Sequence, residues 1–196
     1  MNKLKKIDEG YWFYPVNDFV YDKAYMDKYK EYVDTTIGKG ILDARLRLIS
    51  EYDKILDIGV GCGTLIDNKK DAKGFDVNPE AIKMLKKTKR WCDPYKDDMW
   101  DFDAITFFDS FEHIEKPELL LNRITHEAVV IVIPLFKTVK GILKSKHYRP
   151  DEHYHYFTGG GLIRYMSKHG FHCKSINSEE TELGRDEIHS FVFTRN

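Results

Sequence analysis

The stretch Asp53-Lys-Ile-Leu-Asp-Ile-Gly-Val-Gly-Cys-Gly63 determines how the rest of the chain can be interpreted. Residues 54–58 form a short apolar run that predicts a buried strand, and glycines follow at positions 59, 61 and 63. Because glycine has no Cβ and tolerates positive φ angles, such a turn lets the backbone approach a ligand closely. The stretch therefore predicts a ligand-binding turn between a strand and a helix. A glycine-rich turn that binds nothing is the alternative.

The glycine spacing excludes two common nucleotide motifs. A dinucleotide turn requires G-x-G-x-x-G/A, but the third position here is Thr64 or Ile66, depending on the first glycine counted. A phosphate loop requires Gly-Lys-Ser/Thr after its glycines, which this stretch lacks. Residues 72–76 then predict a second strand that ends in Asp76, 17 positions after Gly59. In nucleotide-binding α/β folds an acidic residue about 20 positions on accepts hydrogen bonds from ribose hydroxyls.

Two stretches together indicate a family. Leu-Asp-Ile-Gly-x-Gly-x-Gly at residues 56–63 resembles motif I of the class I, Rossmann-like, S-adenosylmethionine (SAM)-dependent methyltransferases. Asp76-Val-Asn-Pro-Glu-Ala-Ile82 resembles their acidic loop, with Asn78 as a helix cap and Pro79 in the first turn. The resemblance covers roughly residues 50–195. It is nearest to small-molecule, sugar and quinone O-methyltransferases, and it implies SAM as the cofactor.

The order of predicted elements indicates an α/β fold, because strands alternate with helices. The expected strands are 54–58, 72–76, 90–93, 102–108, 128–133, 171–176 and 188–193, and the expected helices are 63–69, 79–88, 117–123 and 158–169. We expect a doubly wound, mostly parallel seven-stranded sheet with an antiparallel C-terminal edge hairpin. Residues 1–196 are expected to form one methyltransferase domain, with an N-terminal helical cap over 1–50 and a SAM-binding core over 51–196.

The N-terminal region is rich in aromatic residues. The run Tyr11-Trp-Phe-Tyr14 is expected to plug the core, and lining a lid is the alternative. Tyrosines at 21, 25, 29 and 32 fall on one face of a helix. We interpret them as a packing stripe; the alternative is that some hydroxyls face an active site. A second helix is expected over 41–49, with Gly38 and Gly40 separating the two helices.

The resemblance assigns residues to the cofactor. Asp57 would face the amino-acid end of SAM, and Asp76 would accept from both ribose hydroxyls. Asp93 matches the position whose carboxylate accepts from the adenine amino group. The other positions implied for cofactor binding are Gly59, Gly61, Gly63, Val77 and Phe108.

Three histidines are candidates for catalysis. The stretch 102–117, with its core Phe111-Glu-His113, resembles the Leu-Glu-His stretch that follows strand four in small-molecule O-methyltransferases. Residues 151–158 resemble the His-rich segment before the last helix in sugar and metabolite methyltransferases. His113 and His153 or His155 would therefore meet over the acceptor, where a histidine can act as a base at neutral pH. A structural hydrogen bond is the alternative for each histidine.

A metal-dependent variant stays open but is not favoured. Asp109, Glu112 and His113, with His153 downstream, resemble the E-x-x-E-H plus distal His pattern of metal-dependent small-RNA 2′-O-methyltransferases. Such groups suit Mg²⁺, Mn²⁺ or Zn²⁺, and the metal would acidify the acceptor hydroxyl. The leading hypothesis is methylation of a small-molecule acceptor, with oxygen as the expected acceptor atom. The alternatives are this RNA methyltransferase and a non-catalytic SAM-binding protein whose acceptor side is blocked by Trp12 or Phe13.

Composition bounds the partners. The formal net charge is −1, so we expect no nucleic-acid partner. Six basic residues between 137 and 149 are interpreted as part of a solvated loop, and the alternative is that they bind an anionic acceptor. Three separated cysteines predict a reducing compartment rather than a disulfide framework. The N-terminal residues are not followed by an apolar run, so we expect no signal peptide and a cytoplasmic protein without a membrane span. The oligomeric state stays open.

Overall fold

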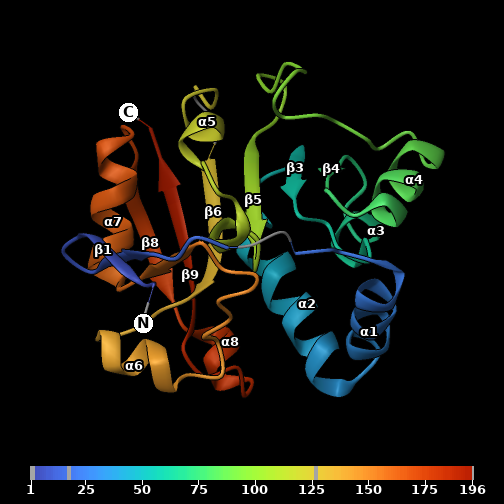
Figure 1. Cartoon of the computed structure of the whole chain (residues 1–196). Helices are drawn as coiled ribbons and strands as arrows, with labels where there is room; N and C mark the ends of the chain where they lie inside the picture. Colours follow the sequence, from blue (N-terminus) through green and yellow to red (C-terminus); the bar gives the residue numbers. More distant parts are fainter. Residues whose placement is uncertain (1–2, 17–18, 126–127, 196) are drawn as a thin grey trace.

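The computed structural model describes residues 3–16, 19–125 and 128–195. Its centre is a six-stranded sheet with the order β4-β3-β5-β6-β9-β8 (Figure 1). The strands are β3 (Ile55–Ile58), β4 (Lys73–Phe75), β5 (Ala104–Phe108), β6 (Ala128–Pro134), β8 (His172–Asn177) and β9 (Ile188–Thr194). β4, β3, β5 and β6 are parallel, and β9 is antiparallel to both β6 and β8. The expected mostly parallel sheet with an antiparallel edge is therefore confirmed.

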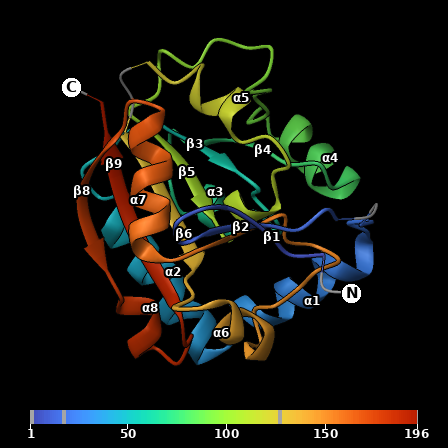
Figure 2. The same ribbon diagram turned by 60° about the vertical axis from the view of Figure 1, so that its left-hand side comes forward.

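Helices cover both faces of this sheet (Figures 1 and 2). On β6, Val129 and Ile131 belong to one hydrophobic cluster, with residues of α5 (Glu118–Leu121) and α7 (Gly159–Lys168). The alternate residues Val130 and Val132 belong to a second cluster, with residues of α2 (Thr36–Leu48), α3 (Thr64–Asp67) and α4 (Pro79–Lys87). All seven β6 residues are buried, as expected for a strand covered on both faces. The doubly wound arrangement is thus confirmed.

A second, three-stranded antiparallel sheet has the order β1-β2-β7, formed by β1 (Lys5–Asp8), β2 (Tyr11–Phe13) and β7 (His155–Phe157). Tyr11 stacks on Phe157 with ring centroids 4.5 Å apart, and Trp12 is buried opposite Tyr156. The aromatic run therefore plugs the core, as predicted. The prediction of a purely helical cap over 1–50 is wrong for residues 5–13, because β2 pairs with β7 and buries both Tyr11 and Trp12.

The prediction of seven strands in the main sheet is also wrong for the residues described. Around 90–93 the pairing is limited to one isolated bridge between Gly74 and Trp91. Two backbone hydrogen bonds join Gly74 to Arg90 and Cys92. Pro94 follows, and the Asp93 carboxylate accepts a hydrogen bond from the backbone of Tyr95, so the chain turns away before a strand can extend.

Two helices follow in the N-terminal part, α1 (Lys23–Val33) and α2. They are separated at Thr35, whose side chain caps α2 by accepting from Gly38 N at 3.0 Å. Gly38 and Gly40 lie inside α2, so the prediction that they separate the helices is wrong. A Cβ on Gly38 would lie 2.2 Å from the Tyr32 carbonyl oxygen, so this glycine lets the end of α1 approach α2 closely.

Two short helices lie outside the helices expected from the sequence. Thr138 caps α6 (Val139–Lys144), and α8 (Glu179–Glu182) precedes β9. The helix α7 has Thr158 as its cap, as predicted. A 3₁₀ turn, η1 (Phe111–His113), follows β5. Within the described residues, no helix has both the length and the apolar character that crossing a bilayer requires.

Candidate active site

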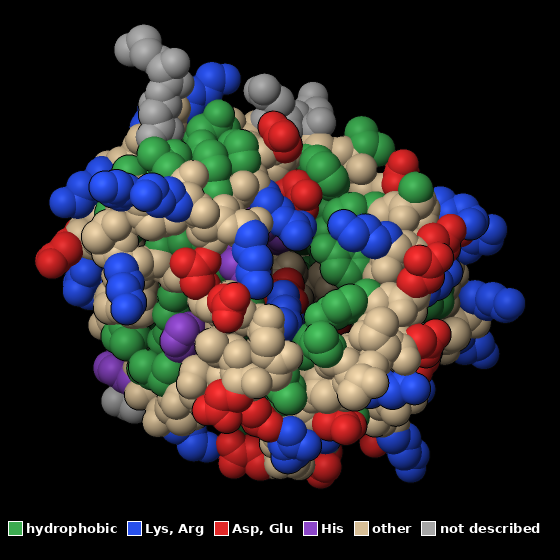
Figure 3. Space-filling model, turned by 90° about the horizontal axis from the view of Figure 1, so that it is seen from below, with side chains coloured by type: hydrophobic (Ala, Val, Ile, Leu, Met, Phe, Trp, Pro, Cys, Tyr) green, Lys and Arg blue, Asp and Glu red, His purple; other side chains and the backbone are tan. Residues whose placement is uncertain are grey.

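A cavity of about 480 Å³ lies at the carboxyl ends of β3, β4 and β5. The sheet order diverges here, since β4 lies on one side of β3 and β5 on the other, and ligands of open α/β sheets bind at such a point. The molecule is hollowed on the face seen in Figure 3, and charged side chains stand around the hollow. We divide the wall into two parts. The glycine side consists of lining residues within 57–65 and 75–78, and the tyrosine side of lining residues within 21–33, 109–115 and 147–154 together with Arg45 and Arg185.

The turn on the glycine side has left-handed backbone at three positions. Gly59, Gly61 and Gly63 have φ angles of 86°, 54° and 85°, which side chains other than glycine rarely adopt. A Cβ on Gly59 would lie 2.5 Å from Ser110, whereas a Cβ on Gly61 would meet no atom within 4 Å. Gly61 therefore faces open cavity. Gly63 is not part of the cavity wall; it is the N-cap of α3, and a Cβ there would lie 2.6 Å from the Met84 side chain.

Asp76 closes the turn from the next strand. It follows β4, is 8% exposed, and lines the cavity beside the exposed Val77. Its Oδ2 accepts from Gly61 N at 2.9 Å, and its Oδ1 accepts from Asn78 N at 2.8 Å. Burial raises the pKa of this carboxyl, while the backbone bonds oppose the shift. Each oxygen retains a lone pair, so the carboxylate can still accept from a ligand.

Asp57 lies near the end of β3, just before the glycines. It is 3% exposed and lines the cavity, and its Oδ1 accepts from the Thr106 hydroxyl at 2.6 Å. Burial raises its pKa to about 6, against the opposing effect of the Thr106 bond. The group therefore ionises close to neutral pH, where a cationic ligand would favour the charged form.

The other two predicted cofactor residues differ. Phe108, at the end of β5, lines the cavity, and the Arg45 guanidinium lies 5.0 Å from its ring centroid. Asp93 does not contribute to the wall described by the structure. Its carboxylate instead accepts from Tyr95 N at 3.0 Å and pairs with Lys96 at 3.1 Å. Tyr95 is the residue of this turn that reaches the cavity.

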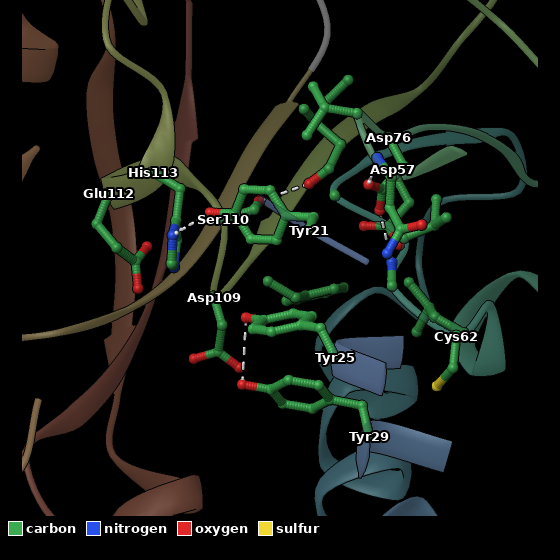
Figure 4. A pocket seen from close by; sticks show the side chains of 18 of the residues that line it. Tyr21, Tyr25, Tyr29, Asp57, Cys62, Asp76, Asp109, Ser110, Glu112 and His113 are labelled. Atoms are coloured by element: carbon green, nitrogen blue, oxygen red, sulfur yellow. Dashed lines mark hydrogen bonds between the residues drawn. The ribbon is translucent and has the colours of Figure 1, made fainter. Parts of the chain in front are cut away.

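The tyrosine side contains all four residues of the predicted stripe, at positions 21, 25, 29 and 32. The Tyr21 hydroxyl bonds His113 Nδ1 at 2.8 Å, and the hydroxyls of Tyr25 and Tyr29 lie 3.4 Å apart (Figure 4). The preferred interpretation as a packing stripe is therefore wrong, and the alternative holds: several hydroxyls face the cavity. Helical spacing alone does not say which partner a face has.

Asp109 lies in a four-residue charge cluster. Its carboxylate bonds Arg45 at 2.5 Å and both terminal nitrogens of Arg185 at 3.0 Å. Glu180, which is 2% exposed, bonds both arginines from the other side. Burial raises the Asp109 pKa, but the two arginines outweigh it and hold the pKa well below its usual range. Asp109, directly after β5, also has φ 53°, a left-handed conformation that aspartate adopts more readily than most residues other than glycine.

The structure brings three predicted residues together at the end of η1. Glu112 and His113 are consecutive, and the rings of His113 and His153 lie edge to face with centroids 4.5 Å apart. Glu112 and His153 are 1% and 4% exposed. Burial raises the pKa of Glu112 to about 8 and lowers that of His113 to about 4, and it also lowers the pKa of His153. Asp109 does not join them, because both of its oxygens are engaged by arginines, so the structure groups three of the four residues of the metal-dependent alternative.

His155 lies outside the cavity wall. Its Nδ1 bonds the Tyr11 hydroxyl at 2.8 Å and its Nε2 bonds the Ile114 carbonyl at 2.7 Å. Since Nε2 must donate to the carbonyl, Nδ1 accepts from Tyr11, and both ring nitrogens are used. The hydrogen bonds join β2, β7 and η1, so the structural alternative describes His155 better than a catalytic role.

The fold and site define a nucleotide-binding α/β protein: a parallel sheet, a glycine turn after its first strand, and a carboxylate from the next strand facing that turn. Comparison with known proteins makes the class more specific. The sequence matches the family model described as "Methyltransferase domain" over residues 29–176, which is more than half of the chain. The chain belongs to this family of methyltransferase domains. A search of curated proteins gives no significant match.

Solved structures share the fold at low identity. A SAM-dependent methyltransferase from Thermotoga maritima, described as a possible histamine N-methyltransferase, matches with a TM-score of 0.63 at 16% identity, over 88% of this chain and 97% of that one. Magnesium protoporphyrin IX methyltransferase from Synechocystis matches with 0.60 at 10% identity, over 89% and 95%. A Burkholderia thailandensis 1,6-didemethyltoxoflavin-N1-methyltransferase matches with 0.58 at 14% identity, over 100% of both. Other matched methyltransferases are longer, and the chain spans 54% to 61% of their length.

Several wall residues were not predicted. Among them are Arg45, Tyr95, Ser110 and Arg185, whereas Arg149 is one of the six basic residues noted between 137 and 149. Ser110 lies between β5 and η1. Its hydroxyl donates to the Ile58 carbonyl at 2.5 Å and so holds η1 against the glycine turn. The arginines come from α2 and from the loop after α8, and no local motif marks them.

Proposed function

We propose that this protein binds SAM on the glycine side and transfers its methyl group to a small-molecule acceptor on the tyrosine side. The observation that carries the proposal is the open space at Gly61, bordered by the Asp76 carboxylate and by Asp57. A nucleoside fits there with its ribose hydroxyls donating to Asp76. The positively charged amino group of SAM would lie at Asp57 and would favour the ionised form of this carboxyl.

We propose oxygen as the acceptor atom. In this reaction the acceptor oxygen forms a bond to the methyl carbon while the carbon–sulfur bond breaks, and the electron pair stays on sulfur to give S-adenosylhomocysteine (SAH). The hydroxyl proton must leave, and burial lowers the pKa of His153, a wall residue whose Nδ1 has no hydrogen-bond partner among the described residues. Much of the rate would come from alignment of the two substrates. The names of two structural neighbours support a small acceptor, since one methylates a porphyrin and the other a toxoflavin precursor. The second name specifies a nitrogen acceptor, so the names do not themselves favour oxygen.

The acceptor space supports a flat organic molecule. Its wall carries four tyrosines together with Ile41 and Leu42, and aromatic side chains bind planar rings by stacking. Its charges are largely paired internally, because Arg45 and Arg185 bond Asp109 and Glu180. Trp12 and Phe13 are not part of the described cavity wall, so the predicted blockage that would favour a non-catalytic protein is not supported.

Calorimetric titration of the purified protein with SAH tests the cofactor assignment. We expect one SAH per chain with micromolar affinity, in the range typical of enzyme–substrate binding. ATP and NAD serve as controls because they share the adenosine but lack the sulfur and amino-acid end. Equal affinity for ATP, or no SAH binding at millimolar concentration, would refute the proposal.

A further inference from the structure

Two buried polar atoms on the tyrosine side lack a hydrogen-bond partner within the described protein: Glu112 Oε2 and His153 Nδ1. Their residues are 1% and 4% exposed, so bulk water does not satisfy them. A buried polar group left unpaired is destabilising because it loses its hydrogen bonds to water. Two such atoms come from segments 41 positions apart and border the same cavity. This arrangement indicates a ligand that bonds both.

A third group completes a compact set. One ligand atom from each of Glu112, His113 and His153 lies within 4.8 Å of the others. In a tetrahedral site with metal–nitrogen bonds of about 2.1 Å the ligand atoms lie about 3.4 Å from one another. Side-chain movements on the order of 1 Å therefore close the set around a single ion. We propose that Glu112, His113 and His153 bind a divalent transition-metal ion on the tyrosine side of the cavity.

The donor types decide which metal the site takes. Two imidazoles and one carboxylate suit Zn²⁺, Mn²⁺ or Fe²⁺, whereas Mg²⁺ and Ca²⁺ prefer oxygen ligands. Only three protein ligands are present among the described residues, and all three border the cavity, so further coordination positions face the acceptor space. An open position is the property that distinguishes a catalytic metal site from a structural one.

Neighbouring groups orient the histidine ligands. The Tyr21 hydroxyl bonds His113 Nδ1 at 2.8 Å, which leaves Nε2 for the ion and fixes the ring (Figure 4). The backbone of Glu152 also hydrogen-bonds this ring in the metal-free protein, and a bound ion replaces that contact. Glu112 and His153, whose ligand atoms have no other partner, therefore carry the site, and His113 completes it.

One consequence rests on the proposed methyl transfer. An acceptor hydroxyl bound to the ion loses its proton more readily, because a divalent cation lowers the pKa of oxygen ligands. The proton then passes to solvent on coordination, and His153 acts as a ligand rather than as the base. Metal binding itself does not depend on this step.

The test uses Co²⁺, whose visible absorption reports its coordination. Protein freed of metal with chelator is titrated with Co²⁺, and thermal unfolding is followed in parallel. We expect one ion per chain, absorption in the visible range, and a higher Tm with metal. Glu112→Gln and His153→Gln should each weaken Co²⁺ binding by at least about 100-fold, above the range seen for residues that only orient a ligand. His172→Gln, which removes an exposed histidine of β8, is the control and should change nothing.

Three results would overturn the site: no one-to-one binding, unchanged affinity in both ligand variants, or displacement of Co²⁺ by equimolar Mg²⁺. Thermal unfolding of each variant shows whether it is folded. If Glu112→Gln is unfolded, the Co²⁺ affinity of His153→Gln decides the test. SAH titration of the same samples separates the two proposals. Co²⁺ binding without SAH binding would support the metal site and refute the proposed methyl transfer. SAH binding without Co²⁺ binding would support the cofactor assignment and refute the metal site.

Discussion

The glycine side of the cavity is built from two short stretches of chain, 57–65 and 75–78, whereas the tyrosine side is assembled from segments as distant as Tyr21 and Arg185. On the glycine side the ligand groups are backbone atoms and two carboxylates; Asp76 is held by the backbone of Gly61, and Asp57 by Thr106 of the adjacent strand β5. On the tyrosine side the contacts span the sequence, such as Tyr21 to His113 and Arg45 to Glu180. Bonds within and between neighbouring strands fix the glycine side, and the docking of distant elements fixes the tyrosine side.

This difference has a consequence for specificity. A site made of consecutive residues keeps its shape when distant parts of the chain change, so it suits a ligand that is the same in every member of a family. A site made from several elements changes when any of them shifts. We therefore expect substitutions on the glycine side to alter SAH affinity, and those on the tyrosine side to alter stability or acceptor choice.

The largest expected effect comes from Gly61→Val. The side chain would enter the open space at this position, and a β-branched residue at φ 54° is strained. We expect SAH affinity to fall by at least about 100-fold, equal to roughly 3 kcal/mol, in calorimetric titration. Gly184→Val is the matched control, since Gly184 also has a positive φ and open space around its Cβ position but lies outside the cavity wall. A similar loss in both variants would contradict the role of Gly61.

Asp76→Asn should weaken SAH binding by about 30-fold, or about 2 kcal/mol, because a neutral amide replaces a charged acceptor of hydrogen bonds. Asp103→Asn provides the control. Asp103 accepts from the backbone nitrogens of Asp53 and Lys54, at 3.0 and 2.8 Å, but is exposed and away from the cavity. SAH affinity within a factor of three of the unsubstituted protein for Asp76→Asn would exclude a ribose contact at this carboxylate.

On the tyrosine side, Arg185→Met should lower the free energy of unfolding by about 2 kcal/mol, since it leaves Asp109 and Glu180 sharing one arginine. The value lies below that of a fully buried pair because the Arg185 side chain is 20% exposed. Denaturant unfolding measures it, with the exposed Arg164→Met as control. SAH affinity should stay unchanged, and a large loss of it would show that the two sides are coupled.

The pH dependence of SAH binding follows from Asp57. Its pKa is about 6 in the folded protein, so below pH 6 the carboxyl is protonated and no longer attracts the SAH amino group. We expect affinity to fall about tenfold per pH unit below 6, and Asp57→Asn to remove this dependence. A pKa raised above the unfolded value of 3.8 also means that the folded state holds the proton more tightly, so this group stabilises the fold at low pH and that contribution is lost as pH rises from 4 to 6. An unchanged affinity between pH 5 and 7 would contradict the role of Asp57.

The smallest expected effect comes from Tyr21→Phe, which removes the hydrogen bond to His113. We expect a loss of about 1 kcal/mol in the free energy of unfolding and no change in SAH affinity. Tyr32→Phe, on the same wall but 39% exposed, should change stability by less than about 0.5 kcal/mol. Equal effects of the two substitutions would show that the Tyr21 bond is not specific.

Most of the sheet was predictable because its strands are short apolar runs bounded by glycine, proline and charged residues. The run 128–133 corresponds to β6, and Asn78 and Thr158 cap helices as expected. The hairpin β1-β2 was missed, because its partner β7 lies more than 140 residues away and leaves no local pattern. The same reason explains which parts of the site could be predicted. Asp57 and Asp76 belong to local motifs, whereas the role of the tyrosine stripe and the pairing of Asp109 with Arg45 and Arg185 depend on how distant elements dock.

The pairing of β2 with β7 bears on how the protein is made. Phe13 lies opposite His155, so β2, although paired with β1, lacks its second partner β7 until the ribosome has completed most of the chain. Contacts between residues so distant in sequence form slowly, and Tyr11 and Trp12 stay uncovered meanwhile. The His153 segment is held by this late pairing. We therefore expect the glycine turn to be in place during synthesis well before the histidines that face it.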